Sequence, residues 1–344
     1  MPSSNRRAVT DFQRIVVRAT NWVGDAVMSL PALFALRTRF PNAHIAIVAR
    51  PWVAGIYARE PFANEVIPYH EGARWEVIRK LRKGQYDCAL LLQNAFDAAL
   101  LVLLAGIPER VGYSRDARRL LLTNPIPVPK PSEIPRHQRF YYLELLRRAG
   151  WIDDYPASES IRLSRAADAR AAGRRRFHAL GCGAVVGVSP GAAFGGAKRW
   201  LPERFAEAAA SVARETGATV VLFGSAGEAE LCSQVMARIE GVAVQNLAGK
   251  TTLAEFIEYA AACRVFLTND SGAMHIASAL GVPTVTVFGA TDETATGPTG
   301  SHTRIVREPV DCSPCLLREC PIDHRCMQRV SAARVAQTAL DLLK

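Results

Sequence analysis

The chain has 344 residues, of which 49% are hydrophobic, 22% charged and 8% aromatic, and its formal net charge is +10. This composition excludes a disordered, collagen-like or coiled-coil protein and predicts about two domains. The longest apolar stretch, residues 98–105, is far shorter than the ~20 residues that cross a bilayer. Residues 1–13 lack the apolar region of a secretion signal, so we expect a disordered tail and a cytoplasmic protein without a transmembrane segment.

The positive charge is concentrated in the first half. Residues 1–165 hold 24 Lys and Arg against 15 Asp and Glu, a net charge of +9, whereas residues 166–344 carry only +1. An anionic partner would be attracted mainly by the first half, although a basic surface that only keeps the protein soluble is an equal alternative. No helix-turn-helix, RNP-type or finger pattern accompanies the basic residues, so nucleic acid is not the expected partner.

Short apolar runs alternate with helical patterns along the first half. Four runs have the composition of strands buried on both faces of a parallel sheet, namely residues 14–19, 44–50, 65–69 and 86–93. Helical patterns lie at residues 26–40, 75–83, 95–105 and 136–149, and five prolines mark residues 125–135 as a loop. This alternation predicts a doubly wound α/β domain over residues 14–165.

The second half repeats the pattern. Strands are predicted at residues 184–190, 218–225, 264–270 and 283–289, and helices at residues 166–180, 202–216, 227–239, 252–262 and 272–280. We therefore expect a second doubly wound domain over residues 166–329, with a Cys-rich loop at 312–326 and a C-terminal helix within 330–344. Two such domains place the carboxyl ends of their strands around one cleft, where ligands bind.

The loop after the first strand carries a candidate base. Gly24 and Asp25 stand where a strand turns into a helix, so the carboxylate projects at the helix N-terminus. Asp25 is either a base or a helix N-cap, and position alone favours the cap. Neither a dinucleotide-binding glycine fingerprint nor a P-loop occurs in the sequence.

Two loops of the second half have the composition of an anion-binding site. The segment SPGAAFGGAKRW, residues 189–200, contains small residues followed by Lys198. The Lys198 ammonium would bind a diphosphate as a point charge. The alternative interpretation is a flexible loop without a ligand. Asp270, Ser271 and Gly272 form a strand-to-helix turn with free amides, and His275 lies one helical turn further on.

A third loop of the second half offers a hydroxyl and a carboxylate. Ser225 is expected to cap the helix that follows it. Either Glu228 or Glu230 is placed to accept a hydrogen bond from a ribose hydroxyl, or these glutamates only complement the helix dipole.

Eight cysteines divide into two sets. Cys88, Cys182, Cys232 and Cys263 are scattered and are interpreted as small buried hydrophobes. Cys312, Cys315, Cys320 and Cys326, with His324 among them, form C-x2-C-x4-C-x5-C. This spacing fits a structural zinc site equally as well as reduced thiols in a compact loop, and a closed site of this kind takes no part in catalysis.

The order and spacing of these motifs resemble those of glycosyltransferase family 9, the ADP-heptose:lipopolysaccharide heptosyltransferases, from about residue 14 to the end. The resemblance is carried by NWVGDAVMSLPAL, SPGAAFGGAKRWLPERFAEAA, VVLFGSAGEAE and TNDSGAMHIASALGVPTVTVFG. It implies a GT-B fold, in which two Rossmann-like domains enclose an interdomain cleft. The acceptor is then expected on the first domain and the nucleotide sugar on the second, with the C-terminal helix packing back toward the first.

The resemblance also implies an activity. Members transfer heptose with inversion, without a metal or other cofactor, from ADP-L-glycero-β-D-manno-heptose to the anionic lipopolysaccharide inner core at the cytoplasmic face of the inner membrane. Asp25 matches the base, and Lys198, Ser271, Gly272 and His275 match the diphosphate-binding positions. Asp270, Ser225 and Glu228 join them on the donor side, and Asn21, Trp22 and Gly24 lie on the acceptor side.

Three alternatives remain at this point. The motifs N-W-V-G-D and A-K-R-W favour heptosyl-Kdo2-lipid A as acceptor, but a sibling enzyme acting on Kdo2-lipid A or a later core sugar would look similar. A GT-B epimerase or hydrolase would turn over the donor without an acceptor. A non-catalytic binder of anionic ligands would rely on the basic first half alone.

Overall fold

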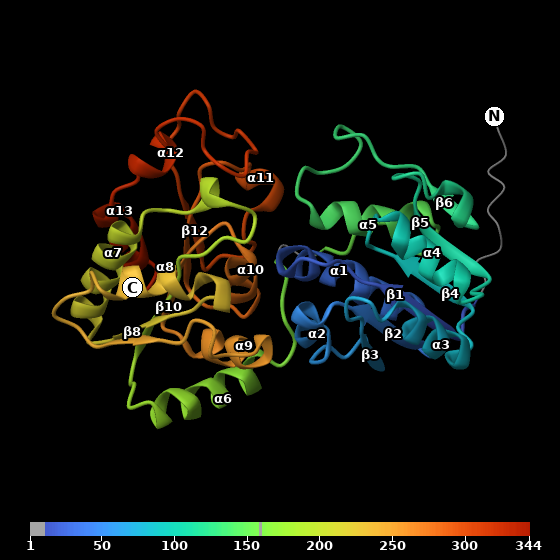
Figure 1. Cartoon of the computed structure of the whole chain (residues 1–344), viewed down its shortest axis with the longest axis horizontal. Coiled ribbons are helices and arrows are strands. Elements are labelled where there is room, and N and C mark those ends of the chain that lie inside the picture. Colours follow the sequence, from blue (N-terminus) through green and yellow to red (C-terminus); the bar gives the residue numbers. More distant parts are fainter. Residues whose placement is uncertain (1–10, 158–159) are drawn as a thin grey trace. The chain divides into compact units, whose positions relative to one another are not determined.

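The computed structural model describes residues 11–157 and 160–344, which form two compact units, Met1–Ser158 and Glu159–Lys344 (Figure 1). Each unit contains one six-stranded sheet whose recorded strand pairs are all parallel, and helices alternate with the strands along the chain. The predicted α/β class with two doubly wound domains is therefore confirmed.

The first unit has the strand order β3-β2-β1-β4-β5-β6. Its strands are β1 (Arg14–Arg18), β2 (His44–Ala49), β3 (Glu65–Pro68), β4 (Cys88–Leu91), β5 (Glu109–Tyr113) and β6 (Asn124–Ile126). Its helices are α1 (Val23–Arg39), α2 (Pro51–Tyr57), α3 (Arg74–Gly84), α4 (Phe96–Leu104) and α5 (Arg139–Arg148). The sequence prediction missed α2, β5 and β6. Pro125 lies inside β6, which is possible because β6 is an edge strand.

The second unit has the strand order β12-β11-β10-β7-β8-β9. Its strands are β7 (Val185–Ser189), β8 (Thr219–Leu222), β9 (Val244–Asn246), β10 (Val265–Asn269), β11 (Thr284–Val287) and β12 (Thr303–Val306). Its helices are α6 (Ala166–Ala179), α7 (Pro202–Thr216), α8 (Ala229–Met236), α9 (Leu253–Ala262), α10 (Gly272–Ala279), α11 (Glu293–Thr296), α12 (Arg325–Gln328) and α13 (Ala332–Asp341). The edge strands β9 and β12 were missed.

The N-terminal tail was predicted to be disordered over residues 1–13, of which residues 1–10 lie outside the described part. Phe12 packs against Phe40 and Trp151, with ring centroids 5.6 and 6.0 Å apart. The Gln13 amide donates to the carboxylate of Asp87 at 2.7 Å. The tail is thus ordered from these residues onward, because aromatic packing and a hydrogen bond hold it.

The C-terminal helix packs within its own unit. Val335, Ala336 and Ala339 of α13 are buried in the same core as Phe205 of α7. The apolar side of α13 is thus used against α7 and β11, and the expectation that residues 330–344 pack toward the first domain stays a prediction.

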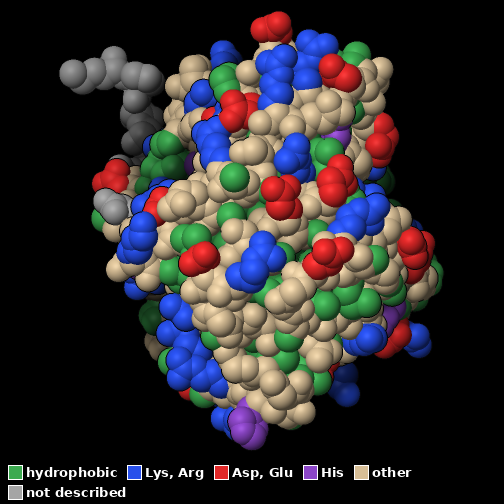
Figure 2. Space-filling model, turned by 90° about the vertical axis from the view of Figure 1, so that its left-hand side faces the viewer, with side chains coloured by type: hydrophobic (Ala, Val, Ile, Leu, Met, Phe, Trp, Pro, Cys, Tyr) green, Lys and Arg blue, Asp and Glu red, His purple; other side chains and the backbone are tan. Residues whose placement is uncertain are grey.

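The surface carries charges of both signs. On the face shown in Figure 2, basic and acidic side chains are interspersed. Among the described residues, we find no helix whose length and apolarity would allow it to span a bilayer.

A buried carboxylate anchors α5, which packs against α1. The Glu144 side chain is fully buried and accepts hydrogen bonds from Arg147 at 2.6 Å, Arg148 at 2.6 Å and the Tyr155 hydroxyl at 2.7 Å. Burial by itself raises the pKa of Glu144, but these hydrogen bonds outweigh it and lower the pKa to about 2.

We predict that Glu144→Gln lowers the free energy of unfolding by about 2 kcal/mol near neutral pH, because charge-assisted hydrogen bonds are lost. A lowered pKa stabilises the fold fully above the ordinary glutamate value of 4.5, and this contribution disappears as the pH falls toward 2. Urea unfolding at pH 7 and pH 3 should therefore give a smaller difference between variant and wild type at pH 3. Glu215→Gln, at an exposed position of α7, is the control; a difference independent of pH would contradict the assignment.

Candidate functional site

The order of strands in the second sheet brings two loops together. Because β7 pairs with β8 on one side and with β10 on the other, the chain leaves the sheet in opposite directions at this point. The β7–α7 loop, residues 190–201, and the turn from β10 into α10 both start at the carboxyl ends of these neighbouring strands. Such a switch point is where open α/β sheets bind ligands.

Asn269, the last residue of β10, ties the β7–α7 loop to the sheet. Its side chain is fully buried; Nδ2 donates to the Pro190 carbonyl at 2.7 Å, and Oδ1 accepts from the Trp200 amide at 2.9 Å. The two ends of the loop are therefore held by one amide group. Sequence reasoning missed Asn269, because an Asn beside the charged Asp270 gives no signal of contacts to residues about 70 positions away.

Lys198 and Asp270, both predicted on the donor side, meet in the structure. Lys198 Nζ lies 2.6 Å from Oδ2 of Asp270, and both side chains are largely buried. The same oxygen accepts from the Thr291 hydroxyl at 2.6 Å. The ammonium also lies 4.9 Å from the centre of the Phe194 ring. The Asp270 carboxylate therefore orients the Lys198 ammonium. The backbone of the β7–α7 loop brings Lys198 to the carboxyl edge of the second sheet.

The turn after β10 has the arrangement expected from the sequence. Ser271 is the N-cap of α10 without a side-chain cap, Gly272 is the first helical residue, and the Ser271 hydroxyl lies 3.2 Å from that of Thr268. His275 is buried one turn further on, and its amide donates to the Ser271 carbonyl at 3.4 Å. The first amides of a helix have no partner within it, so this end of α10 favours an anion.

Ser225 and Glu228 form a capping box at the start of the turn before α8. Glu228 Oε2 accepts from the Ser225 amide and hydroxyl, both at 2.8 Å. The other oxygen, Oε1, faces Gly191, where an added Cβ would lie only 1.9 Å away. Glycine at position 191 leaves room for the Glu228 carboxylate, which therefore lies beside the β7–α7 loop.

In the first unit, the predicted acceptor-side residues follow β1. Trp22 is the N-cap of α1 and is 55% exposed, and Gly24 and Asp25 lie in the first turn. Asp25 is thus not the N-cap. Burial is the main cause that raises the pKa of Tyr142, and the charge of Asp25 and a hydrogen bond to it contribute. A buried phenol from α5 therefore helps to orient the Asp25 carboxylate.

Two arginines beside this loop were not predicted. Arg18, the last residue of β1, is buried and donates to the Ala19 carbonyl at 2.6 Å and to Oδ1 of Asn21 at 2.8 Å. Burial, followed by the charge of Arg50, lowers the pKa of Arg18 to about 10. The Arg50 guanidinium lies 4.5 Å from the centre of the Tyr69 ring, and its Nε is buried without a partner among the described atoms. The positive charges of Arg18 and Arg50 repel each other, so this part of the first unit favours an anionic ligand that neutralises them.

The Cys-rich segment, which we define as residues 311–326, offers no support for a zinc site, one of the two interpretations of its spacing. Within 11–157 and 160–344, no group of three or more His, Cys, Asp and Glu side chains is placed to hold a metal ion, so a zinc at Cys312, Cys315, Cys320 and Cys326 is not supported. All four cysteines are free, and their exposure differs: Cys326 is buried in the core, whereas Cys312 is exposed. Burial raises the pKa of the Cys326 thiol, and the neighbouring thiols add to this effect.

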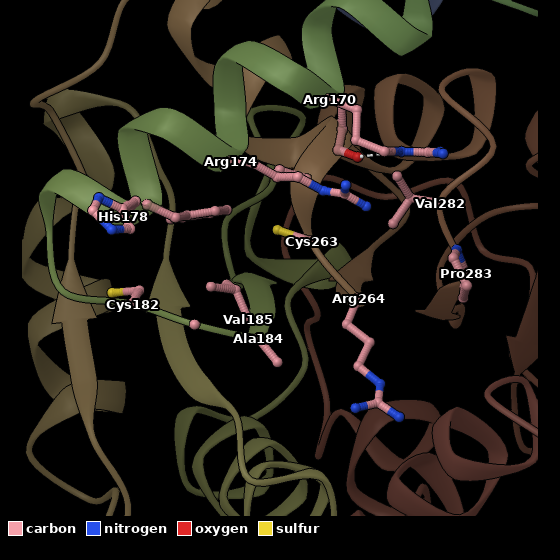
Figure 3. A pocket seen from close by; sticks show the side chains of 14 residues that line it. Arg170, Arg174, His178, Cys182, Ala184, Val185, Cys263, Arg264, Val282 and Pro283 are labelled. Atoms are coloured by element: carbon pink, nitrogen blue, oxygen red, sulfur yellow. Dashed lines mark hydrogen bonds between the residues drawn. The ribbon is translucent and has the colours of Figure 1, made fainter.

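A cavity of about 570 Å³ lies at the opposite end of the second sheet. Its lining includes Arg170 and Arg174 of α6 and Arg264, which precedes β10 (Figure 3). None of the predicted site residues lines it, because they follow the carboxyl ends of the strands. This cavity is therefore separate from the candidate site.

The chain is similar to known proteins over most of its length. The model of glycosyltransferase family 9 (heptosyltransferase) matches residues 74–325. Lipopolysaccharide heptosyltransferase 2 of Salmonella typhimurium is 33% identical over 316 residues, covering 86% of this chain and 88% of the relative. Lipopolysaccharide heptosyltransferase 1 of Pseudomonas aeruginosa is 26% identical over 334 residues, covering 89% and 87%.

A solved structure has the same fold. The structure of E. coli ADP-heptose lps heptosyltransferase II superposes with a TM-score of 0.82 and 31% sequence identity, covering 96% of this chain and 98% of that one. The similarity extends over both units, so the chain has the two-domain GT-B fold.

We predict that Asn269→Ala lowers the free energy of unfolding by about 2–4 kcal/mol, because the Trp200 amide and the Pro190 carbonyl both lose a buried partner. The unfolding transition of the second unit in urea measures this loss of free energy. Gln234→Ala removes an amide that bonds only the exposed Glu230 side chain and should change the free energy by less than ~0.5 kcal/mol. Equal effects of the two substitutions would contradict the role of Asn269.

Proposed function

Because the chain belongs to glycosyltransferase family 9, we propose that it acts as a lipopolysaccharide heptosyltransferase 2, which transfers L-glycero-D-manno-heptose from ADP-heptose to heptosyl-Kdo2-lipid A. The observation that carries this proposal is the anion-binding arrangement around Lys198 at the switch point of the second sheet, with a carboxylate, Asp25, at the corresponding edge of the first. The higher identity to a type 2 enzyme than to a type 1 enzyme favours heptosyl-Kdo2-lipid A as the acceptor.

The donor is bound by the second unit. The Lys198 ammonium and the first amides of α10, at Ser271 and Gly272, face the diphosphate, with His275 one turn below them. Asp270 acts as a positioning residue, since its carboxylate would repel the diphosphate but holds Lys198 in place. Glu228 accepts a hydrogen bond from a ribose hydroxyl through Oε1, while Oε2 keeps its bonds to Ser225.

The reaction is a single displacement with inversion. The acceptor hydroxyl attacks the anomeric carbon and forms the new C–O bond, while the bond to the diphosphate oxygen breaks and its electron pair leaves with ADP. Asp25 takes the proton of the attacking hydroxyl as general base. Lys198 and the amides of α10 stabilise the negative charge that develops on the departing ADP, so the proposed mechanism uses no metal or other cofactor.

The acceptor is bound by the first unit. Its inner-core sugars carry carboxylates and phosphates, which Arg50 and the neighbouring Arg18 attract. The exposed Trp22 and Trp52 rings beside them offer surfaces on which sugar rings pack. The net charge of +9 in residues 1–165 favours a transient, peripheral location of this cytoplasmic enzyme at the inner face of the inner membrane.

We predict that Asp25→Asn lowers kcat roughly 10²- to 10⁴-fold while ADP-heptose binding is retained, because the amide cannot accept the proton. Mass spectrometry of heptosyl-Kdo2-lipid A and, separately, of Kdo2-lipid A after incubation with ADP-heptose measures the transfer. One added heptose on the heptosylated acceptor alone, lost in the variant, is the expected result.

Asp154→Asn, an exposed carboxylate of the same unit, serves as the matched control for Asp25→Asn and should keep full activity. A heptose gained by Kdo2-lipid A instead would identify the type 1 reaction. ADP-heptose turnover without any acceptor would identify an epimerase or hydrolase, and neither transfer nor turnover would favour the non-catalytic binder.

We predict that Lys198→Ala weakens the binding of ADP-heptose about tenfold, because a charge-assisted contact to the diphosphate is lost. Isothermal titration calorimetry with ADP and with adenosine measures the effect. Adenosine lacks the diphosphate, so its binding should be unchanged. Lys344→Ala, at the exposed C-terminus, is the control, and an ADP affinity equal to that of the wild type would remove Lys198 from the donor site.

A further inference from the structure

The Cys-rich segment, which the proposed reaction does not use, lies directly against the β7–α7 loop. The Ala197 amide donates to the Arg318 carbonyl at 2.9 Å. The Gly196 amide donates to Oε1 of Glu319 at 2.9 Å. Two successive amides of the loop are thus bound to a segment about 120 residues further along the chain.

Two more contacts join the same parts. His324 Nε2 lies 3.0 Å from the Ala197 carbonyl oxygen, which can only accept, so Nε2 carries the proton of this hydrogen bond. The Arg318 guanidinium lies 5.4 Å from the centre of the Phe194 ring, over which the Lys198 ammonium also lies. The segment therefore contacts both the backbone of the loop and the ring beside Lys198.

The backbone amides next to Lys198 are already used. The Lys198 amide donates to the Gly195 carbonyl at 3.3 Å, and the Arg199 amide donates to the Gly196 carbonyl at 2.9 Å. Together with the two amides bound to the Cys-rich segment, four successive amides face protein atoms. Around Lys198, the loop consequently offers a ligand the ammonium group and not these four amides.

At Gly195, the β7–α7 loop and the Cys-rich segment lie so close together that a side chain would not fit. A Cβ added at Gly195 would lie 2.2 Å from the backbone oxygen of Arg318, which cannot move aside as a flexible side chain would. Glycine at this position therefore serves the contact with the Cys-rich segment.

We propose that the Cys-rich segment positions the β7–α7 loop, with Glu319 and His324 as positioning residues that hold the backbone before Lys198 so that its ammonium stays at the diphosphate position. Asn269 and Asp270 hold the loop from the sheet, and the Cys-rich segment adds a second, separate set of contacts. This inference rests on the proposed role of Lys198 in donor binding.

The test compares Glu319→Ala with Glu319→Gln, which keeps an oxygen acceptor for the Gly196 amide. Asp323→Ala is the matched control, because the Asp323 carboxylate lies in the same segment but bonds only Arg325. Hydrogen exchange of a peptide spanning the β7–α7 loop reports the contact itself. Steady-state kinetics with ADP-heptose and calorimetry with ADP report its consequence.

We expect Glu319→Ala to raise amide exchange in the loop about tenfold and the KM for ADP-heptose about fivefold, with kcat changed less than twofold, since one hydrogen bond is lost. Glu319→Gln should restore both quantities, and Asp323→Ala should change neither. Unchanged exchange in Glu319→Ala would overturn the proposal, and so would faster exchange with an unchanged KM.

Lys198→Ala in the same assays separates this inference from the proposed function. If Lys198→Ala weakens ADP binding and Glu319→Ala does not, the positioning role of the segment fails alone. If Lys198→Ala leaves ADP binding unchanged, the donor-site role of Lys198 fails, and with it the purpose proposed for the segment.

Discussion

The pairing of β7 with β10 is the constraint on which the rest of the second unit depends. These strands are far apart in sequence, and their parallel register places the ends of both at one edge of the sheet. Asn269 can then bond both ends of the β7–α7 loop, and Asp270 can reach Lys198. The charged groups are thus positioned by backbone hydrogen bonds of a buried sheet, whose geometry side-chain motion does not disturb.

In both units, a loop that follows the carboxyl end of a central strand carries the site residues, but the chemical groups of these residues differ. In the first sheet, β1 pairs with both β2 and β4, and the loop after β1 carries Asp25. There the Asp25 carboxylate is hydrogen-bonded to the buried phenol of Tyr142, whereas in the second unit the carboxylate of Asp270 forms an ion pair with Lys198. The first unit therefore presents a carboxylate near a helix N-terminus, and the second presents an ammonium group that a carboxylate holds in place.

The sequence predicted most strands of both sheets because buried parallel strands are continuous apolar runs, as in residues 185–189. The sequence prediction missed the edge strands β6, β9 and β12 and the interior strand β5; β6 contains Pro125 and β9 is partly exposed, whereas the edge strand β3 was predicted. Lys198 and Asp270 were found as charges beside small residues, but Asn269 was not, because its contacts depend on strand order. The small residues of segment 189–200 were interpreted as part of an anion-binding loop, whereas the neighbour of Gly195, Arg318, is distant in sequence and so left no local pattern.

Prolines stand in both outer strands of the first sheet, Pro68 at the end of β3 and Pro125 inside β6. A proline has no amide hydrogen, so neither edge offers an unbroken row of donors to a strand from another molecule. The first sheet is consequently protected at both edges against edge-to-edge association. For a protein proposed to work at a crowded membrane surface, this arrangement keeps neighbouring copies from joining their sheets and aggregating.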